Sequence, residues 1–191
     1  MAEGINLLGG LDLDITEPEF EYINAFITET VEATGIGSHQ LKHAGMNHLD
    51  GVQAVAYGRL RLMDSDYERT ARQRKIISLS LDKAKKADWH TIHQIILTVF
   101  PQVATSADLE DILTMGRDIS RYHIGATYGF PETRSETRVR GASVVVARNL
   151  ALNVKYLHEF LFEDKDYKPT SGVWELSDHI QKLTGLGEVE R

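Results

Sequence analysis

The chain has 191 residues, of which 28 are acidic and 21 basic, so its formal net charge is −7. Hydrophobic residues make up 42% and charged residues 26%, which excludes disordered, collagen-like and coiled-coil proteins. The absence of cysteine excludes disulfides, thiolate zinc sites and a cysteine nucleophile. No apolar run reaches the roughly 18 residues that a membrane span needs. We therefore expect neither a membrane anchor nor a secretory signal in this chain.

Apolar periodicity and capping residues predict the first elements. Residues 11–15 alternate between apolar and acidic side chains, which predicts a half-buried strand. Residues 20–34 carry apolar side chains at helical spacing. Asp50 is followed three residues later by Gln53, a capping-box pattern that predicts a short helix ending near Tyr57.

The rest of the chain is predicted to contain more helices than strands. A long helix is expected over residues 67–86, with Ser65 and Glu68 as its capping box, and further helices after Asp88 and Asp108. The later expected elements are strands over 122–128 and 137–147 and helices over 148–162 and 174–183. This mixture indicates an α/β or α+β protein.

A basic segment lies between Arg59 and Lys75 of the acidic chain. It holds six basic and three acidic residues, so its local charge is +3 and the remainder of the chain carries −10. A positive segment in an acidic protein indicates local anion binding rather than a general nucleic-acid surface.

The spacing within this segment favours a phosphate ligand. Arg59 and Arg61 alternate, so they share one face of an extended segment. Arg69 and Gln73 share one face of a helix, with Arg72 beside them. Because a guanidinium matches phosphate oxygens in pairs, these residues predict a pyrophosphate site. The alternative is a solvated helix face with surface ion pairs.

Several segments, in this order, resemble the LytR-CpsA-Psr family. They are residues 9–14 (GGLDLD), 49–54 (LDGVQA), 57–61 (YGRLR), 64–73 (DSDYERTARQ) and, less closely, 105–113. The resemblance implies an α/β fold with a sheet sandwiched between helical layers. It also implies a partial domain of this kind over residues 1–163 and a C-terminal extension over 164–191.

The resemblance also implies an activity and its partners. Members of the family are membrane-anchored enzymes at the extracytoplasmic face of the cell membrane. They transfer a glycopolymer, such as teichoic acid or capsular polysaccharide, from a polyprenyl-diphosphate carrier to peptidoglycan. No nucleic-acid partner is expected.

Individual site residues follow from the resemblance by position. Arg59 and Arg61 match the family's paired arginines, which contact the diphosphate. The acid, arginine and glutamine of its active site, and a basic neighbour, match Asp66, Arg69, Gln73 and Arg72.

The residues that hold the metal ion in the family have no counterpart among the matching segments of this chain. The two aspartates that hold Mg²⁺ in the family belong to motifs before the segment that matches residues 9–14, so we expect no Mg²⁺ site in this chain and little activity of the chain alone. One alternative is a non-catalytic module that binds polyprenyl diphosphate or another anion. Another is a DNA-binding regulator, which the acidic remainder and the lack of a clear helix-turn-helix disfavour.

Overall fold

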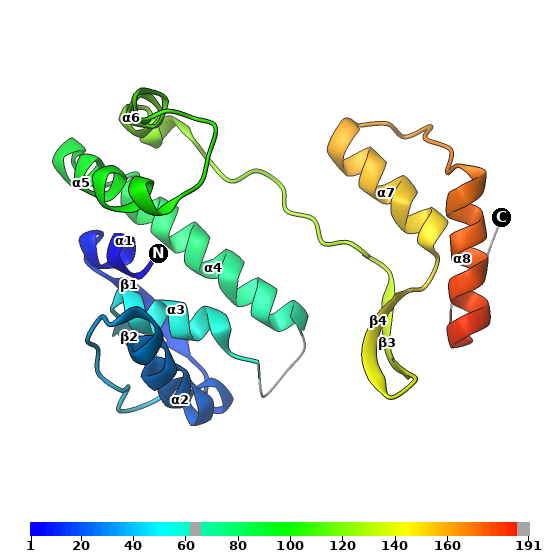
Figure 1. Ribbon diagram of the computed structural model, residues 1–191, viewed down its shortest axis with the longest axis horizontal. Helices are drawn as coiled ribbons and strands as arrows, with labels where there is room; N and C mark the ends of the chain where they lie inside the picture. The colour runs from blue at the N-terminus through cyan, green and yellow to red at the C-terminus, as the bar shows by residue number, and fades with distance from the viewer. Residues whose placement is uncertain (62–65, 187–191) are drawn as a thin grey trace. The chain divides into compact units, whose positions relative to one another are not determined.

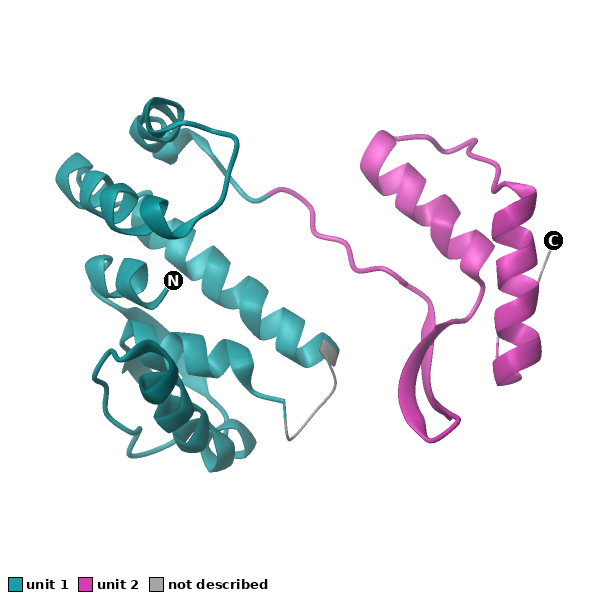
Figure 2. Cartoon of the chain, viewed as in Figure 1, with its two compact units in different colours: residues 1–124 teal, residues 125–191 magenta. Residues whose placement is uncertain are grey.

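The computed structural model describes residues 1–61 and 66–186, with the side chain of Asp66 excepted, and the chain divides into two compact units, residues 1–124 and 125–191 (Figure 2). Residue 163, after which a C-terminal extension is expected, follows the end of helix α7 (Leu150–Phe162) and lies within the second unit. None of the described helices is both long and apolar enough to cross a membrane.

The first unit contains a two-stranded antiparallel sheet formed by β1 (Leu11–Ile15) and β2 (Gly45–Leu49) (Figure 1). The strand expected over residues 11–15 is confirmed. Its three apolar side chains are buried, whereas Asp12 and Asp14 are exposed on the other face. This alternation is what a strand with one covered face requires.

The first four helices of this unit share a hydrophobic core with the covered face of the sheet. The helices of the unit are α1 (Ala2–Leu7), α2 (Glu17–Thr34), α3 (Gly51–Arg59), α4 (Asp66–Ala84), α5 (Trp89–Val99) and α6 (Leu109–Arg117), with short 3₁₀ turns at η1 (Phe100–Gln102) and η2 (Ile119–Arg121). Helix α3 packs against α1, α2 and α4, and the core between them and the sheet includes Ile23, Leu49 and Val52, all fully buried. The predicted mixed α/β class is confirmed.

The predicted capping residues begin three of these helices. Asp50 accepts a hydrogen bond from the N–H of Gln53 at 2.9 Å, and the Gln53 side chain accepts one from the N–H of Asp50 at 2.8 Å, which completes the capping box of α3. Asp108 forms the same kind of capping box with Asp111 at the start of α6, and the Asp88 side chain caps α5 by accepting a hydrogen bond from the N–H of Thr91. The box expected at Ser65 lies outside the described residues.

The second unit joins a hairpin to two helices. Strands β3 (Arg134–Val139) and β4 (Ala142–Ala147) pair antiparallel, and α7 and α8 (Ser171–Thr184) follow. The single strand predicted over 137–147 is wrong because Arg140 and Gly141 turn the chain between the two strands, both with positive φ, as a two-residue hairpin turn requires. The strand predicted over 122–128 is also wrong: this segment has no regular structure and pairs with no described strand.

A cross-strand pair makes the first sheet sensitive to acid. His48 Nδ1 lies 2.6 Å from Asp12 Oδ1, directly opposite on the neighbouring strand. The hydrogen bond from His48, followed by its charge and that of Lys83, lowers the pKa of Asp12 below its ordinary value of 3.8. Because the folded-state pKa is lowered, the contribution to stability is complete above the unfolded value and is lost as the pH falls through the lowered one.

We expect His48→Ala to raise the pKa of Asp12 toward 3.8, measured by carboxyl-detected NMR titration of the intact chain. Lys83→Ala should change it less, because Lys83 contributes only a weak charge effect. An unchanged pKa of Asp12 in His48→Ala would contradict the assignment of the pair.

Candidate functional site

The candidate site is the junction between α3 and α4, which we call the arginine junction: Arg59, Arg61, Arg69, Arg72 and Gln73. Helix α3 ends at Arg59, and Leu60 leaves the helix with φ −52° and ψ 128°. The basic segment therefore lies partly at the end of α3 and partly at the beginning of α4, and the two helices approach it from different directions (Figure 1).

Arg72 is the buried member of this junction. Its side chain is only 6% exposed, and its guanidinium donates a hydrogen bond to the carbonyl oxygen of Leu60 at 2.9 Å. A second nitrogen lies 3.7 Å from the carboxylate of Glu19, itself 9% exposed, on α2. The guanidinium also lies 6.0 Å from the centre of the Tyr57 ring. Arg72 thus joins α2, the end of α3 and α4, and is not part of a solvated helix face.

Gln73 and Gly58 set the approach of α4 to α3. The Gln73 amide donates a hydrogen bond to the carbonyl oxygen of Gly58 at 3.2 Å. A Cβ atom at Gly58 would lie 3.0 Å from Cδ1 of Ile76, so the small residue permits close contact here. Carbonyl groups at the end of a helix lack partners within the helix, and here α4 supplies two of those partners.

Arg59 is oriented toward α2. Its guanidinium donates to Thr30 Oγ1 at 2.9 Å and to the Glu29 carboxylate at 3.4 Å. The Arg59 side chain is nevertheless 43% exposed, so part of its donor set faces solvent. Exposed pairs of this kind contribute little to stability, so an anionic ligand can replace Glu29 at small cost.

The remaining members differ in exposure. Arg61 is exposed and Arg69 is half-buried, whereas the Asp66 side chain lies outside the described residues. The structure thus brings Arg72 and Gln73 against the end of the helix that carries Arg59. Convergence of Arg59, Arg61, Arg69 and Gln73 on one concave surface stays a prediction.

The partners of these arginines were not foreseen from the sequence. Glu19 completes a capping box with Thr16, a signal that the sequence contains, and the same carboxylate group also faces Arg72. Glu29 and Thr30 carry no sequence signal of their contact with Arg59, because that contact depends on how α2 packs against α3.

Because the chain has no cysteine, its potential metal ligands are His, Asp and Glu side chains. Across residues 1–61 and 66–186, apart from the side chain of Asp66, no three His, Asp or Glu side chains are grouped so that they could hold a metal ion. Asp12 lies in the segment over residues 9–14 that resembles the family, and its carboxylate forms a hydrogen bond with His48.

Comparison with solved structures shows the fold. The chain aligns with a protein from Enterococcus faecalis described as a transcriptional regulator (TM-score 0.60, 16% identity, 97% of this chain and 65% of that one). It also aligns with TagV from B. subtilis (0.54, 20%, 88% and 61%). A third match is TagT bound to LIIa-WTA (0.52, 18%, 97% and 58%).

The chain corresponds to only part of each of these proteins. The chain spans about 58 to 65% of the length of these three proteins. No curated protein matches the sequence significantly.

The family itself is shown by the sequence match. The LytR_cpsA_psr family model matches residues 1–154, which include the whole arginine junction and most of the chain. This match confirms the resemblance seen in the motifs around residues 49–73. The chain belongs to the LytR_cpsA_psr family.

Proposed function

We propose that this chain is part of a cell-wall phosphotransferase and that its arginine junction binds the diphosphate of a polyprenyl-linked glycopolymer. Membership of the family supports the proposal, as does the shared fold with TagT, a protein solved bound to LIIa-WTA. The acceptor in the proposed reaction is peptidoglycan, at the extracytoplasmic face of the membrane.

The observation that carries the proposal is the contact of Arg72 and Gln73 with the end of α3. Their hydrogen bonds to Leu60 and Gly58 hold α4 against the turn that carries Arg59 and Arg61. A diphosphate needs several donors held in advance, because each donor ordered on binding costs conformational entropy. The hydrogen bonds of the buried Arg72 and the exposed Gln73 supply this rigidity, while Arg59, Arg61 and Arg69 supply the donors.

The proposed reaction is an in-line transfer at phosphorus. The acceptor hydroxyl forms a new P–O bond to the glycopolymer phosphate, the bond to the second phosphate breaks, and polyprenyl phosphate leaves. Arg59, Arg61 and Arg69 offset the charge that develops on the phosphate oxygens. Asp66, from its family match, orients the hydroxyl and accepts its proton. No step is assigned to a metal ion.

Substitution of Arg61, which is exposed, and of Arg69, which is half-buried, tests the proposed ligand. Arg61→Ala and Arg69→Ala should each weaken binding of a prenyl diphosphate ten- to a hundredfold, because a charge-assisted hydrogen bond contributes about 1.5–3 kcal/mol. Arg61→Lys should also weaken it, since lysine keeps the charge but loses the planar fork. Calorimetry at fixed salt measures the three affinities against the parent chain.

Arg138→Ala is the matched control, because Arg138 is exposed on β3 in the other unit. Equal losses in Arg138→Ala and Arg61→Ala would indicate diffuse electrostatic attraction and no defined site.

A second assay follows labelled lipid-linked glycan onto peptidoglycan. Because little activity of the chain alone is expected, transfer by the purified chain would contradict that expectation, whereas binding of the diphosphate without transfer is the expected result.

A further inference from the structure

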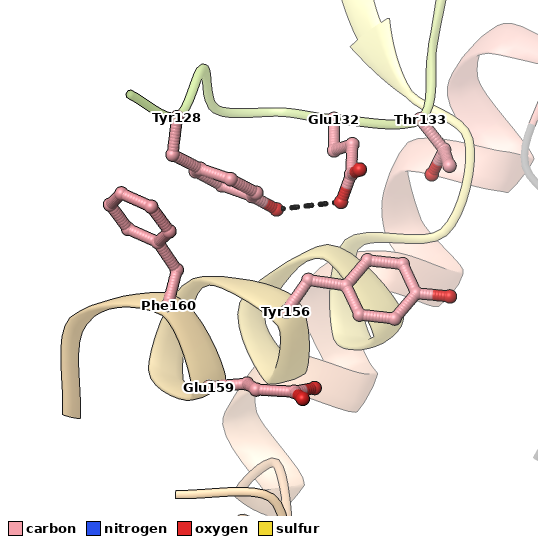
Figure 3. A pocket seen from close by; sticks show the side chains of 6 residues that line it. All are labelled: Tyr128, Glu132, Thr133, Tyr156, Glu159 and Phe160. Carbon is pink, nitrogen blue, oxygen red and sulfur yellow. Dashed lines mark hydrogen bonds between the residues drawn. The ribbon is translucent and has the colours of Figure 1, made fainter. Parts of the chain in front are cut away.

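The second unit contains a cavity that the proposed transferase chemistry does not use. It has a volume of about 460 Å³ and is lined by Tyr128, Glu132, Thr133, Tyr156, Glu159 and Phe160 (Figure 3). The cavity is open to solvent, since Glu132, Glu159 and Phe160 are exposed, and its volume is within the range of known small-ligand sites. Tyr128 and Glu132 come from the segment before β3, whereas Tyr156 and Phe160 project from α7 (Figure 3).

The lining combines aromatic rings with carboxylates. Tyr128 and Phe160 stack with ring centres 4.9 Å apart, and the Tyr128 hydroxyl donates to the Glu132 carboxylate at 3.1 Å. None of the six lining residues is positively charged, and two are acidic. Ring faces carry partial negative charge, so rings and carboxylates together attract a cation with an apolar surface.

One wall of the cavity is held by hydrogen bonds to a buried asparagine. Asn153 on α7 is fully buried; its side-chain oxygen accepts from the N–H of Thr133 at 3.0 Å, and its amide donates to the Thr133 hydroxyl at 2.8 Å. These bonds hold the segment carrying Glu132 and Thr133 over α7. The cavity is thus formed by an anchored segment and a helix, and its groups are placed before a ligand arrives.

We propose that this cavity is a binding site for an organic ammonium cation. The rings contact the apolar surface of the cation, and Glu132 and Glu159 offset its charge. An inorganic cation would prefer a set of oxygen ligands without rings, and an anion would meet two carboxylates. The volume leaves room for a substituent beyond the ammonium group.

The raised pKa of the Tyr128 hydroxyl is consistent with negatively charged groups beside it. Burial, followed by the hydrogen bond and charge of Glu132, raises the pKa of the Tyr128 hydroxyl to about 12. The phenol therefore stays protonated at neutral pH and keeps donating to Glu132, which leaves the other lone pairs of that carboxylate for a ligand.

Titration of the full chain with choline tests the site, with 3,3-dimethylbutan-1-ol as a neutral molecule of the same shape. We expect choline to bind with a millimolar Kd and the neutral molecule at least about tenfold more weakly, because only the cation interacts with the rings and carboxylates. Chemical shifts of Tyr128 and Tyr156 report the location. Glucose, added in a third titration, distinguishes a sugar site built on the same rings.

Two pairs of variants separate the cavity from general charge effects. Glu132→Gln and Phe160→Leu should each weaken choline binding about fivefold, whereas Glu136→Gln and Phe162→Leu, which do not line the cavity, should not change it. Equal binding of choline and its neutral analogue, preference for glucose, no binding at 50-fold the expected Kd, or an equal loss in Glu136→Gln would each overturn the proposal.

Discussion

Replacing Arg72 by alanine is expected to lower the free energy of unfolding of the first unit by about 3–5 kcal/mol, the typical cost of removing one partner of a buried ion pair. The loss leaves the 9%-exposed Glu19 carboxylate without its cation and the carbonyl of Leu60 without its donor. At 3.7 Å the ion pair itself is long, so desolvation of the groups left behind accounts for most of the effect.

Fluorescence can follow the first unit separately. The chain has two tryptophans, Trp89 in the first unit and Trp174 in the second, so a Trp174→Phe background reports urea unfolding of the first unit alone. Arg74→Ala serves as the control, because Arg74 is exposed on the same helix. The double variant Glu19→Gln with Arg72→Met should be more stable than Arg72→Met alone, since it removes the unpaired buried charge. Equal stability of Arg72→Ala and Arg74→Ala would contradict the buried position of Arg72.

Substituting alanine for Gly51 is expected to destabilise the same unit by about 3 kcal/mol, at the upper end of ordinary overpacking. Gly51 is the first residue of α3, and a Cβ atom there would collide with the backbone carbonyl group of Ala2 in α1. Backbone cannot rotate away as a side chain can, so α1 must move from α3. The hydrogen bond from Gly51 N–H to the Asn6 side chain, 2.7 Å long, would be lost with that movement.

Gly4→Ala is the matched control, because Gly4 lies in α1, the helix that Gly51 contacts. Its Cβ atom would lie 3.5 Å from a methyl group of Val99, an ordinary contact, so the helix-forming preference of alanine should make this variant neutral or slightly more stable. Urea unfolding of both variants in the Trp174→Phe background measures the difference. A Gly51→Ala variant as stable as Gly4→Ala would show that α1 does not pack on α3 as described.

Local signals in the sequence were enough for much of the fold. The alternation over residues 11–15 and the capping residues Asp50, Asp88 and Asp108 predicted elements that the structure contains. These signals succeed because a strand's exposed face and a helix's first N–H groups are satisfied within a few residues of sequence. The motifs around residues 49–73 likewise identified the family, which its sequence match confirms.

Pairing between strands determined the structural features that these local signals did not predict. Strand β2 has no apolar alternation of its own, with Met46 67% exposed, and exists through its pairing with β1. Over 137–147 the β-branched residues indicated strand correctly, but the turn at Arg140 and Gly141 depends on two strands pairing with each other.

By itself the sequence determined the family, the mixed α/β class and the basic segment in which the arginine junction lies. Only the tertiary structure distinguished the arginines within it: Arg72 is buried against Glu19, Arg59 reaches Thr30 on α2, and Arg61 is exposed. The same spacing along a helix is compatible with a ligand site, a buried clamp or a solvated face. Which of these a residue becomes depends on the charge and depth of the elements packed against it, and those elements lie far away in the sequence.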